Sequence, residues 1–359
     1  MKTTFCLFLL LFTRLVYGQI PGLTDSIRVV QRSVFLETNA ENPVLNTWQV
    51  NDFYNQLIRF NTEPSYVTPP YADAFGPRSY VLTADINPAF LLLATKRSRW
   101  SFMFTPRVKV RILWDESLPV RTPSFMPGAT VFYHRSDDTA HFSYGSAAIF
   151  HHSNGQDGAE LLANGDFNRI NGNFTTNFTE LAWNWGRYRE LPPINRRLNL
   201  LGTASQRIRD DALSYYKLGL QAHFGSDSVL ASGRYGLWRI NFHTHRIRIG
   251  QYVNRLSLGK NGQDVRVVED RYRAEKDRIS LQVSYILDRY DGYSFFDMSR
   301  RINLEGRYYF HFRSQFSNSS VFAGLGYYGQ DPYNVYLQDH YFFARLGLAY
   351  GLNVYRANR

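Results

Sequence analysis

The sequence predicts an all-β protein: a transmembrane antiparallel β-barrel of about twelve strands that follows a short N-terminal extension. Beyond residue 75, apolar and polar residues alternate with a period of two, as in strands with two different faces. Apolar residues make up 44% of the chain, which is too many for a disordered protein. Beyond residue 20, no stretch reaches the ~18 uninterrupted apolar residues that a membrane-spanning helix needs. The only cysteine is Cys6, so a disulfide scaffold is excluded.

Residues 1–18 have the order of a secretory signal peptide. Lys2 supplies a positive charge, residues 5–12 form a short apolar core, and Gly18 precedes a cleavage site before Gln19. Cys6 lies inside this core, so we expect no thiol in the mature chain. The protein is therefore expected to be exported, and the barrel that follows suggests the bacterial outer membrane.

Residues 19–75 lack clean alternation and contain many Asn, Thr and Pro residues. We interpret them as a periplasmic or plug-like extension, and residues 76–359 as the barrel. Thirteen segments of the barrel region alternate like strands. They are 80–94, 100–114, 124–134, 141–153, 173–185, 187–194, 212–224, 228–240, 245–258, 278–288, 302–312, 319–329 and 341–355. Bacterial barrels use an even number, so one is false, and 187–194 is among the weakest because it contains Pro192 and Pro193.

An extracellular β-sandwich would also produce alternation. Two observations favour the barrel: the polar faces carry Arg, Glu and Gln in mid-strand, and the last strand ends near Tyr355, almost at the C-terminus. A closed barrel leaves no unpaired strand edge in lipid, so every backbone group is satisfied there.

The segment whose residues are suited to catalysis is the end of the predicted strand 141–153. On one face, small and apolar residues give way to His151 and then Ser153. Residues i and i+2 of a strand point the same way, ~6.5–7 Å apart, so this imidazole can act as the base that takes the serine proton. His152 points to the opposite face and is excluded from this pairing. Such pairs are common on solvated strand ends, but a pair that faces lipid is costly and tends to be functional.

Two further roles follow from the neighbouring residues. Asn154 and Gly155 form a turn, and the glycine lets its backbone N–H approach a substrate as an oxyanion donor. The next strand returns beside the first, and an asparagine carbonyl there would accept the histidine N–H and fix its tautomer. Asn173 is preferred because it is nearest to the loop, and Asn177 is the second candidate.

Residues 151–155, His-His-Ser-Asn-Gly, resemble the active-site segment of the outer membrane phospholipase A family (bacterial phospholipase A1), whose pattern is His-x-Ser-Asn-Gly. Residues 117–121 with 125–127, and residues 215–233, are similar to further segments of that family. The resemblance covers roughly residues 80 to 240.

The resemblance implies a twelve-stranded barrel with a catalytic triad on its outer wall. Ser153 would be the nucleophile, His151 the general base and acid, and an asparagine on the next strand would orient His151, while the Gly155 N–H would contribute to the oxyanion hole. The implied reaction is hydrolysis of the acyl esters of phospholipids. The implied cofactor is calcium, and the implied partner is a second copy of the chain in a homodimer.

The loop after the glycine departs from the family pattern. Gln156 replaces an arginine, and the Ser-x-Ser-Trp-Asn-Arg run is missing. Backbone carbonyls of Gln156 or Leu118 would still serve as calcium ligands, because a carbonyl ligand tolerates substitution of its side chain. Asp157 and Glu160 are chemically suitable oxygen donors for calcium. Such acidic loop residues are more often simply solvated.

Two other features have more ordinary interpretations. His243 and His245 have the same-face spacing of a metal pair, but two ligands are too few for zinc, so we interpret them as lining the barrel. The formal net charge is +11. For an exported barrel this favours contacts with anionic lipid headgroups or lipopolysaccharide phosphates over nucleic acid.

Two alternatives to a phospholipase stay open. One is a non-catalytic barrel, a porin or scaffold, that carries the motif without using it. The other is a lipid A deacylase-like esterase, which also uses His-x-Ser on a barrel wall. That family has a smaller barrel of eight strands, which the number of candidate strands disfavours.

Overall fold

The computed structural model describes residues 47–351, except positions 72, 77, 115–119, 121, 195, 201–202, 261–262, 289 and 312–318. Side chains are described throughout this range except at positions 73, 196–200, 203–206, 252–260 and 263–274. The predicted signal peptide, residues 19–46 of the predicted extension, Leu118 and the end of the last predicted strand lie outside the described residues.

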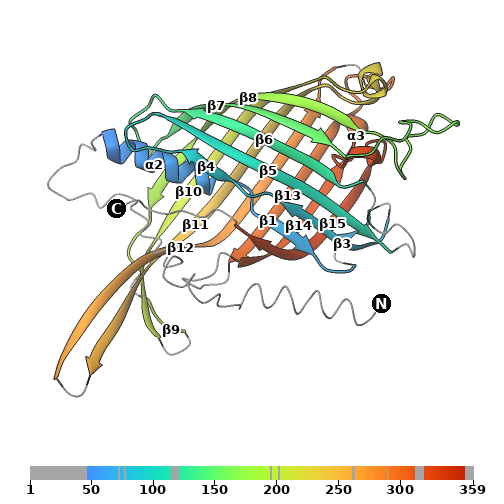
Figure 1. Ribbon diagram of the computed structural model, residues 1–359. Coiled ribbons are helices and arrows are strands. Elements are labelled where there is room, and N and C mark those ends of the chain that lie inside the picture. The colour runs from blue at the N-terminus through green and yellow to red at the C-terminus, as the bar shows by residue number, and fades with distance from the viewer. Residues whose placement is uncertain are drawn as a thin grey trace.

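The described residues form a closed antiparallel β-barrel of twelve strands (Figure 1). The strands, in order around the wall, are β1 (Ser65–Thr68), β3 (Tyr80–Ile86), β5 (Trp100–Leu113), β6 (Ser124–Tyr133), β7 (Ser143–Ser153), β8 (Thr175–Glu190), β10 (Thr203–Phe224), β11 (Trp238–Lys260), β12 (Gln263–Ile286), β13 (Ile302–His311), β14 (Ser319–Tyr328) and β15 (Tyr341–Tyr350). Pairing of β1 with β15, with Tyr66 opposite Ala349, closes the ring. The predicted fold class and strand number are therefore confirmed.

Short elements complete the chain. Strands β2 (Asp73–Ala74), β4 (Phe90–Leu93) and β9 (Arg196–Leu200) pair with β15, β5 and β10 respectively. The helical segments are α2 (Thr47–Phe60), η1 (Leu230–Arg234), α3 (Met298–Arg301) and η2 (Asn334–Tyr336). None of the helices in the described part of the chain is both long and apolar enough to cross a membrane.

The doubt about one of the thirteen segments is confirmed, but other strand assignments are wrong. The segment 187–194 is not a separate strand, because β8 continues to Glu190 and the two prolines follow its end. The segment 228–240 is not one either, because η1 occupies its first half and β11 begins only at Trp238. The missing strand is β1, which lies within the predicted extension 19–75 and is only four residues long, too short for its alternation to be recognised.

The barrel has an apolar outside and a polar inside, because successive side chains of each strand point to opposite faces. Large apolar side chains are exposed on the outer faces of most strands, among them Ile149, Leu181, Trp183, Leu218, Leu220, Ile279, Leu325, Phe342, Leu346 and Leu348. Charged and amide side chains are buried inside, among them Asp85, Arg111, Asn184, Asp211, Glu305, Arg307 and Arg345. Ion pairs such as Arg111–Asp331, at 2.5 Å, compensate this buried charge.

Helix α2 packs against the inner wall near one end of the barrel (Figure 1). Its apolar residues Phe53 and Leu57 contact the core made by inward side chains of β7, β10 and β11, such as Tyr144 and Ile247. At the helix end, Asn61 donates a hydrogen bond of 2.7 Å to the Tyr144 hydroxyl. The predicted plug-like character of the extension is therefore consistent with the part of it that the structure describes.

Loops close the opposite end, where β7 ends and β8 begins. Buried residues of the loops that follow β7, β10 and β14, including Phe167, Tyr235 and Val335, form one apolar cluster. Between this cluster and α2 lies a polar cavity of about 220 Å³, which Asp85, Glu180 and other inward side chains line. The interior is thus filled from both ends.

Candidate active site

The end of β7 places its two histidines on opposite faces, as its parity predicts. His151 and Ser153 share the face of Ile149, which is 52% exposed on the outer wall. His152 is buried inside, where its Nε2 lies 3.1 Å from the Ser124 hydroxyl. The predicted placement of His151 and Ser153 on one face, on the outside of the barrel, is therefore confirmed, whereas their pairing as base and nucleophile stays a prediction.

Asn177 lies directly opposite His151 in the pairing of β7 with β8. Its Oδ1 atom is 2.9 Å from His151 Nδ1. An amide oxygen only accepts, so Nδ1 carries the proton and the Nε2 lone pair is left to act as a base. An imidazole in this tautomer is what a serine nucleophile requires of its partner.

The preference for Asn173 beside the imidazole is wrong. Strand pairing starts at Ser153 and Thr175, so Asn173 lies beyond the ladder and level with the loop. Its backbone N–H donates to the Gly158 carbonyl at 3.0 Å, and its side chain bonds to Asp227. Burial raises the pKa of the Asp227 carboxyl, which also accepts the Thr175 N–H at 2.6 Å. Asn173 thus belongs to the loop support behind the site.

The turn after Ser153 is held in place by the buried side chain of Asn154. Its Nδ2 donates to the Gly172 carbonyl at 2.7 Å, and its Oδ1 accepts the backbone N–H groups of Gln156 and Phe174. The sequence indicates Asn154 only as a turn former, and this anchoring role was missed because its partners lie across the loop.

Gly155 follows with a φ of +68°, a left-handed conformation that favours glycine. Its N–H makes no hydrogen bond to any residue within the described part of the chain. A donor left free next to the serine is what an oxyanion hole needs.

Ser153 itself is half-buried, and Phe125 of β6 lies opposite it. Among the residues that the structure describes, no hydrogen bond joins its hydroxyl to the His151 ring. Catalytic hydrogen bonds of this type often form only when the substrate is bound. Exposed apolar side chains share this outer face: Ile149 is two residues from His151 on β7, and Leu181 of β8 lies farther along the wall, opposite Ala147. The site therefore combines polar groups with an apolar surface.

Of the predicted calcium ligands, Gln156 and Asp157 are neighbours in the loop after Gly155, and Leu118 lies outside the described residues. Asp157 is exposed and belongs to no group of three or more acidic or histidine side chains within the described residues. Gln156 is tied to Asn154 through its backbone N–H. Glu160 accepts the Val229 N–H at 3.2 Å, and burial raises its pKa. The group of three potential metal ligands that the described residues do contain lies elsewhere, at Glu63, His243 and His245.

Comparison with known proteins adds no further identification. No family model matches the chain, and no curated protein matches it. The features that indicate a function are therefore the positions of His151, Ser153, Asn177 and Gly155.

Proposed function

We propose that the protein is a serine esterase of the outer membrane that hydrolyses acyl ester bonds of phospholipids and lysophospholipids. The observation that carries this proposal is the 2.9 Å contact of Asn177 with the His151 ring on the apolar outer wall, with Ser153 on the same face. The motif resemblance to the outer membrane phospholipase A family points in the same direction. Asn177 is the proposed third residue of the catalytic triad, which the motif alone does not identify.

Each residue has a defined role in the proposed reaction. Asn177 holds the His151 N–H at Nδ1, so Nε2 takes the proton of Ser153 as its oxygen attacks the acyl carbonyl carbon. The Gly155 N–H donates to the oxyanion that forms. His151 then gives the proton to the leaving lysophospholipid oxygen, and the acyl group stays on Ser153. Water, deprotonated by His151, releases the fatty acid and restores the serine.

The apolar outer wall supports the membrane location. Strands β6, β13, β14 and β15 are ten residues long, which suits a tilted strand that crosses a hydrocarbon layer. The strands alternate apolar outside with polar inside, as a barrel in lipid does. On this proposal the acyl chains of the substrate lie beside Ile149 and Leu181 while the ester reaches Ser153.

Calcium is proposed as cofactor on the resemblance. Gln156 and Asp157 follow the Gly155 turn and offer oxygen donors, which calcium prefers, and the Asp157 carboxylate makes no hydrogen bond or ion pair with the residues that the structure describes. Bound there, the ion would add positive charge near the oxyanion. A homodimer is proposed on the same resemblance.

A chelator tests the calcium proposal. We expect EDTA to lower fatty-acid release from mixed micelles by at least about tenfold, with recovery on addition of excess Ca²⁺ but not Mg²⁺, because the smaller ion demands a stricter octahedral geometry. Asp157→Asn should raise the Ca²⁺ concentration needed for half-maximal activity. Equal activity with and without chelator would remove calcium from the mechanism.

The packing inside the barrel argues against a porin. A pore needs a continuous water path, whereas here α2 packs inside one end, an apolar loop cluster lies at the other, and the cavity lined by Asp85 and Glu180 is about 220 Å³. The lipid A deacylase-like alternative is disfavoured because the barrel has twelve strands.

Covalent labelling tests the proposed nucleophile directly. An alkyl sulfonyl fluoride carries a long chain and a group that reacts with activated serines. We expect it to modify the full-length protein in micelles once, on the peptide that contains Ser153, and to inactivate it. His151→Ala should slow the modification because the hydroxyl is no longer activated. Labelling of a different serine, or equal labelling of the His151 variant, would contradict the proposed role of Ser153.

A further inference from the structure

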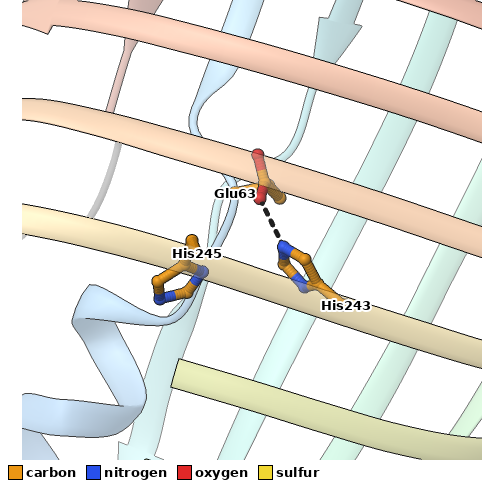
Figure 2. Close-up of side chains that lie close together, drawn as sticks. All are labelled: Glu63, His243 and His245. Atoms are coloured by element: carbon orange, nitrogen blue, oxygen red, sulfur yellow. Dashed lines mark ion pairs between the residues drawn. The ribbon is translucent and has the colours of Figure 1, made fainter. Parts of the chain in front are cut away.

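Three potential metal ligands meet inside the barrel, away from the outer-wall site. Glu63 comes from the segment between α2 and β1, and His243 and His245 come from β11. Figure 2 shows both imidazole rings beside the carboxylate of Glu63. One ligand atom of each residue lies within 4.8 Å of the others, and His243 Nε2 is 2.9 Å from Glu63 Oε1. The N-terminal segment thus supplies the third ligand that the His-x-His pair lacks.

His245 has a ring nitrogen without a partner in this cluster. The side chain is 1% exposed, its Nε2 contacts Asn61 Oδ1 at 2.9 Å, and its Nδ1 is buried without a hydrogen bond within the described part of the chain. Because the Asn61 oxygen accepts, Nε2 carries the proton and Nδ1 keeps its lone pair. A buried nitrogen lone pair without a donor is costly, and a metal ion would satisfy it.

The two oxygens of Glu63 face different neighbours. Oε2 accepts the Tyr309 hydroxyl at 3.0 Å and lies 3.7 Å from Arg307. Oε1 faces His243 and accepts the Ser280 hydroxyl at 2.8 Å. One oxygen is therefore directed toward the histidines, while the other is held by the barrel wall.

Two arginines near the cluster pair with other carboxylates. Arg307 pairs with Glu305 at 2.7 Å, and Arg278 pairs with Glu275 at 2.8 Å, although each of these carboxylates also has a second partner. The charge of Glu63 is therefore not wholly consumed by these arginines, and a cation beside it faces less repulsion than the two guanidinium groups alone would impose.

We propose that Glu63, His243 and His245 bind a divalent transition metal ion such as Zn²⁺, which ties the N-terminal segment to the barrel wall. Imidazole nitrogen with one carboxylate suits such ions, unlike the oxygen donors that calcium prefers. With bonds of ~2.0–2.1 Å, tetrahedral ligands lie roughly 3.4 Å apart, so from within 4.8 Å the His245 ring has to approach by no more than roughly 1.4 Å. The ion replaces the proton between His243 and Glu63, and the Ser280 hydroxyl or a water completes the coordination. This proposal does not rest on the proposed esterase function.

Cobalt binding tests the site, with Co²⁺ as a coloured substitute for Zn²⁺. The full-length protein, folded in detergent micelles and treated with chelator, is titrated with Co²⁺ alone. We expect one equivalent to bind with the visible absorption of a four-coordinate ion, and Zn²⁺ to displace it. His245→Gln and His243→Gln should each lose this signal. The matched control is His141→Gln, because His141 is an exposed histidine outside the cluster, and its ring lies 3.6 Å from Asp138.

A second measurement reports the structural role. Because a ligand that binds only the folded state stabilises it, Zn²⁺ should raise the thermal midpoint and slow hydrogen exchange of the α2 amides in the wild type and in His141→Gln. Neither histidine variant of the site should respond, and the metal-free midpoint of each folded variant identifies any direct loss of stability. Failure of the wild type to bind one equivalent would mean that the site does not exist. Binding by both site variants as in the wild type would mean an adventitious ion only. Either result would overturn the proposal.

Discussion

Ser153→Ala is expected to lower phospholipid ester hydrolysis by at least about 10³-fold, because the variant lacks the proposed nucleophile that forms the acyl-enzyme. The measurement is release of fatty acid from mixed micelles of phospholipid and detergent by the purified protein. His151→Ala should cause a loss of similar size, and the double variant should lose little more, because the two residues act as a unit.

The matched control for this loss is Ser143→Ala. Ser143 lies on the same strand and shares the outer parity of Ser153, but it stands at the opposite end of β7 near α2. This variant should keep wild-type activity and fold equally well. Equal fatty-acid release by the wild type and Ser153→Ala would end the esterase proposal, whatever the state of the barrel.

Asn177→Ala is expected to lower kcat by roughly 10- to 100-fold with little change in KM, because the imidazole loses the acceptor that fixes its tautomer. Asn177 is assigned to act through His151, which it contacts, so it is a positioning residue. The conservative variant Asn177→Asp should recover most of the activity, since its carboxylate oxygen accepts the same N–H. A merely structural role would not predict this rescue.

Asn173→Ala is the comparison that separates the two asparagines. Asn173 bonds to Asp227 in the loop region, so its loss should change activity by less than about threefold. It should also lower the thermal midpoint of the protein, because the loop loses this hydrogen bond. A larger kcat loss in Asn173→Ala than in Asn177→Ala would contradict the assigned geometry.

Most of what the sequence predicts correctly follows from strand parity, that is, from the rule that every second side chain of a strand points to the same face. The alternation of small and apolar residues before His151 is local information, so it assigns His151 and Ser153 to one face and His152 to the other without any long-range contact. The same alternation predicts the barrel and the exposed face of β12, where Ile279 is exposed and Ser280 is buried.

Register and long-range contacts could not be read in the same way. The partner of His151 depends on where pairing with β8 starts, and the long loop between the two strands hides that start. Distance from the loop favours Asn173, whereas the strand register places Asn177 opposite His151, so the preference for Asn173 is wrong. Likewise, Glu63 reaches His243 only because the N-terminal segment folds back into the lumen. No local pattern encodes such a contact across 180 positions of the chain.

The outward placement of His151 and Ser153 also determines how a lipid would arrive. On the proposed function, with α2 and loops packed inside the barrel, such a molecule would come to the wall sideways, by lateral diffusion within its own leaflet. Encounter frequency then depends on the mole fraction of substrate in the surface, not on its bulk concentration. Diluting the lipid with inert detergent at constant total substrate should therefore slow turnover.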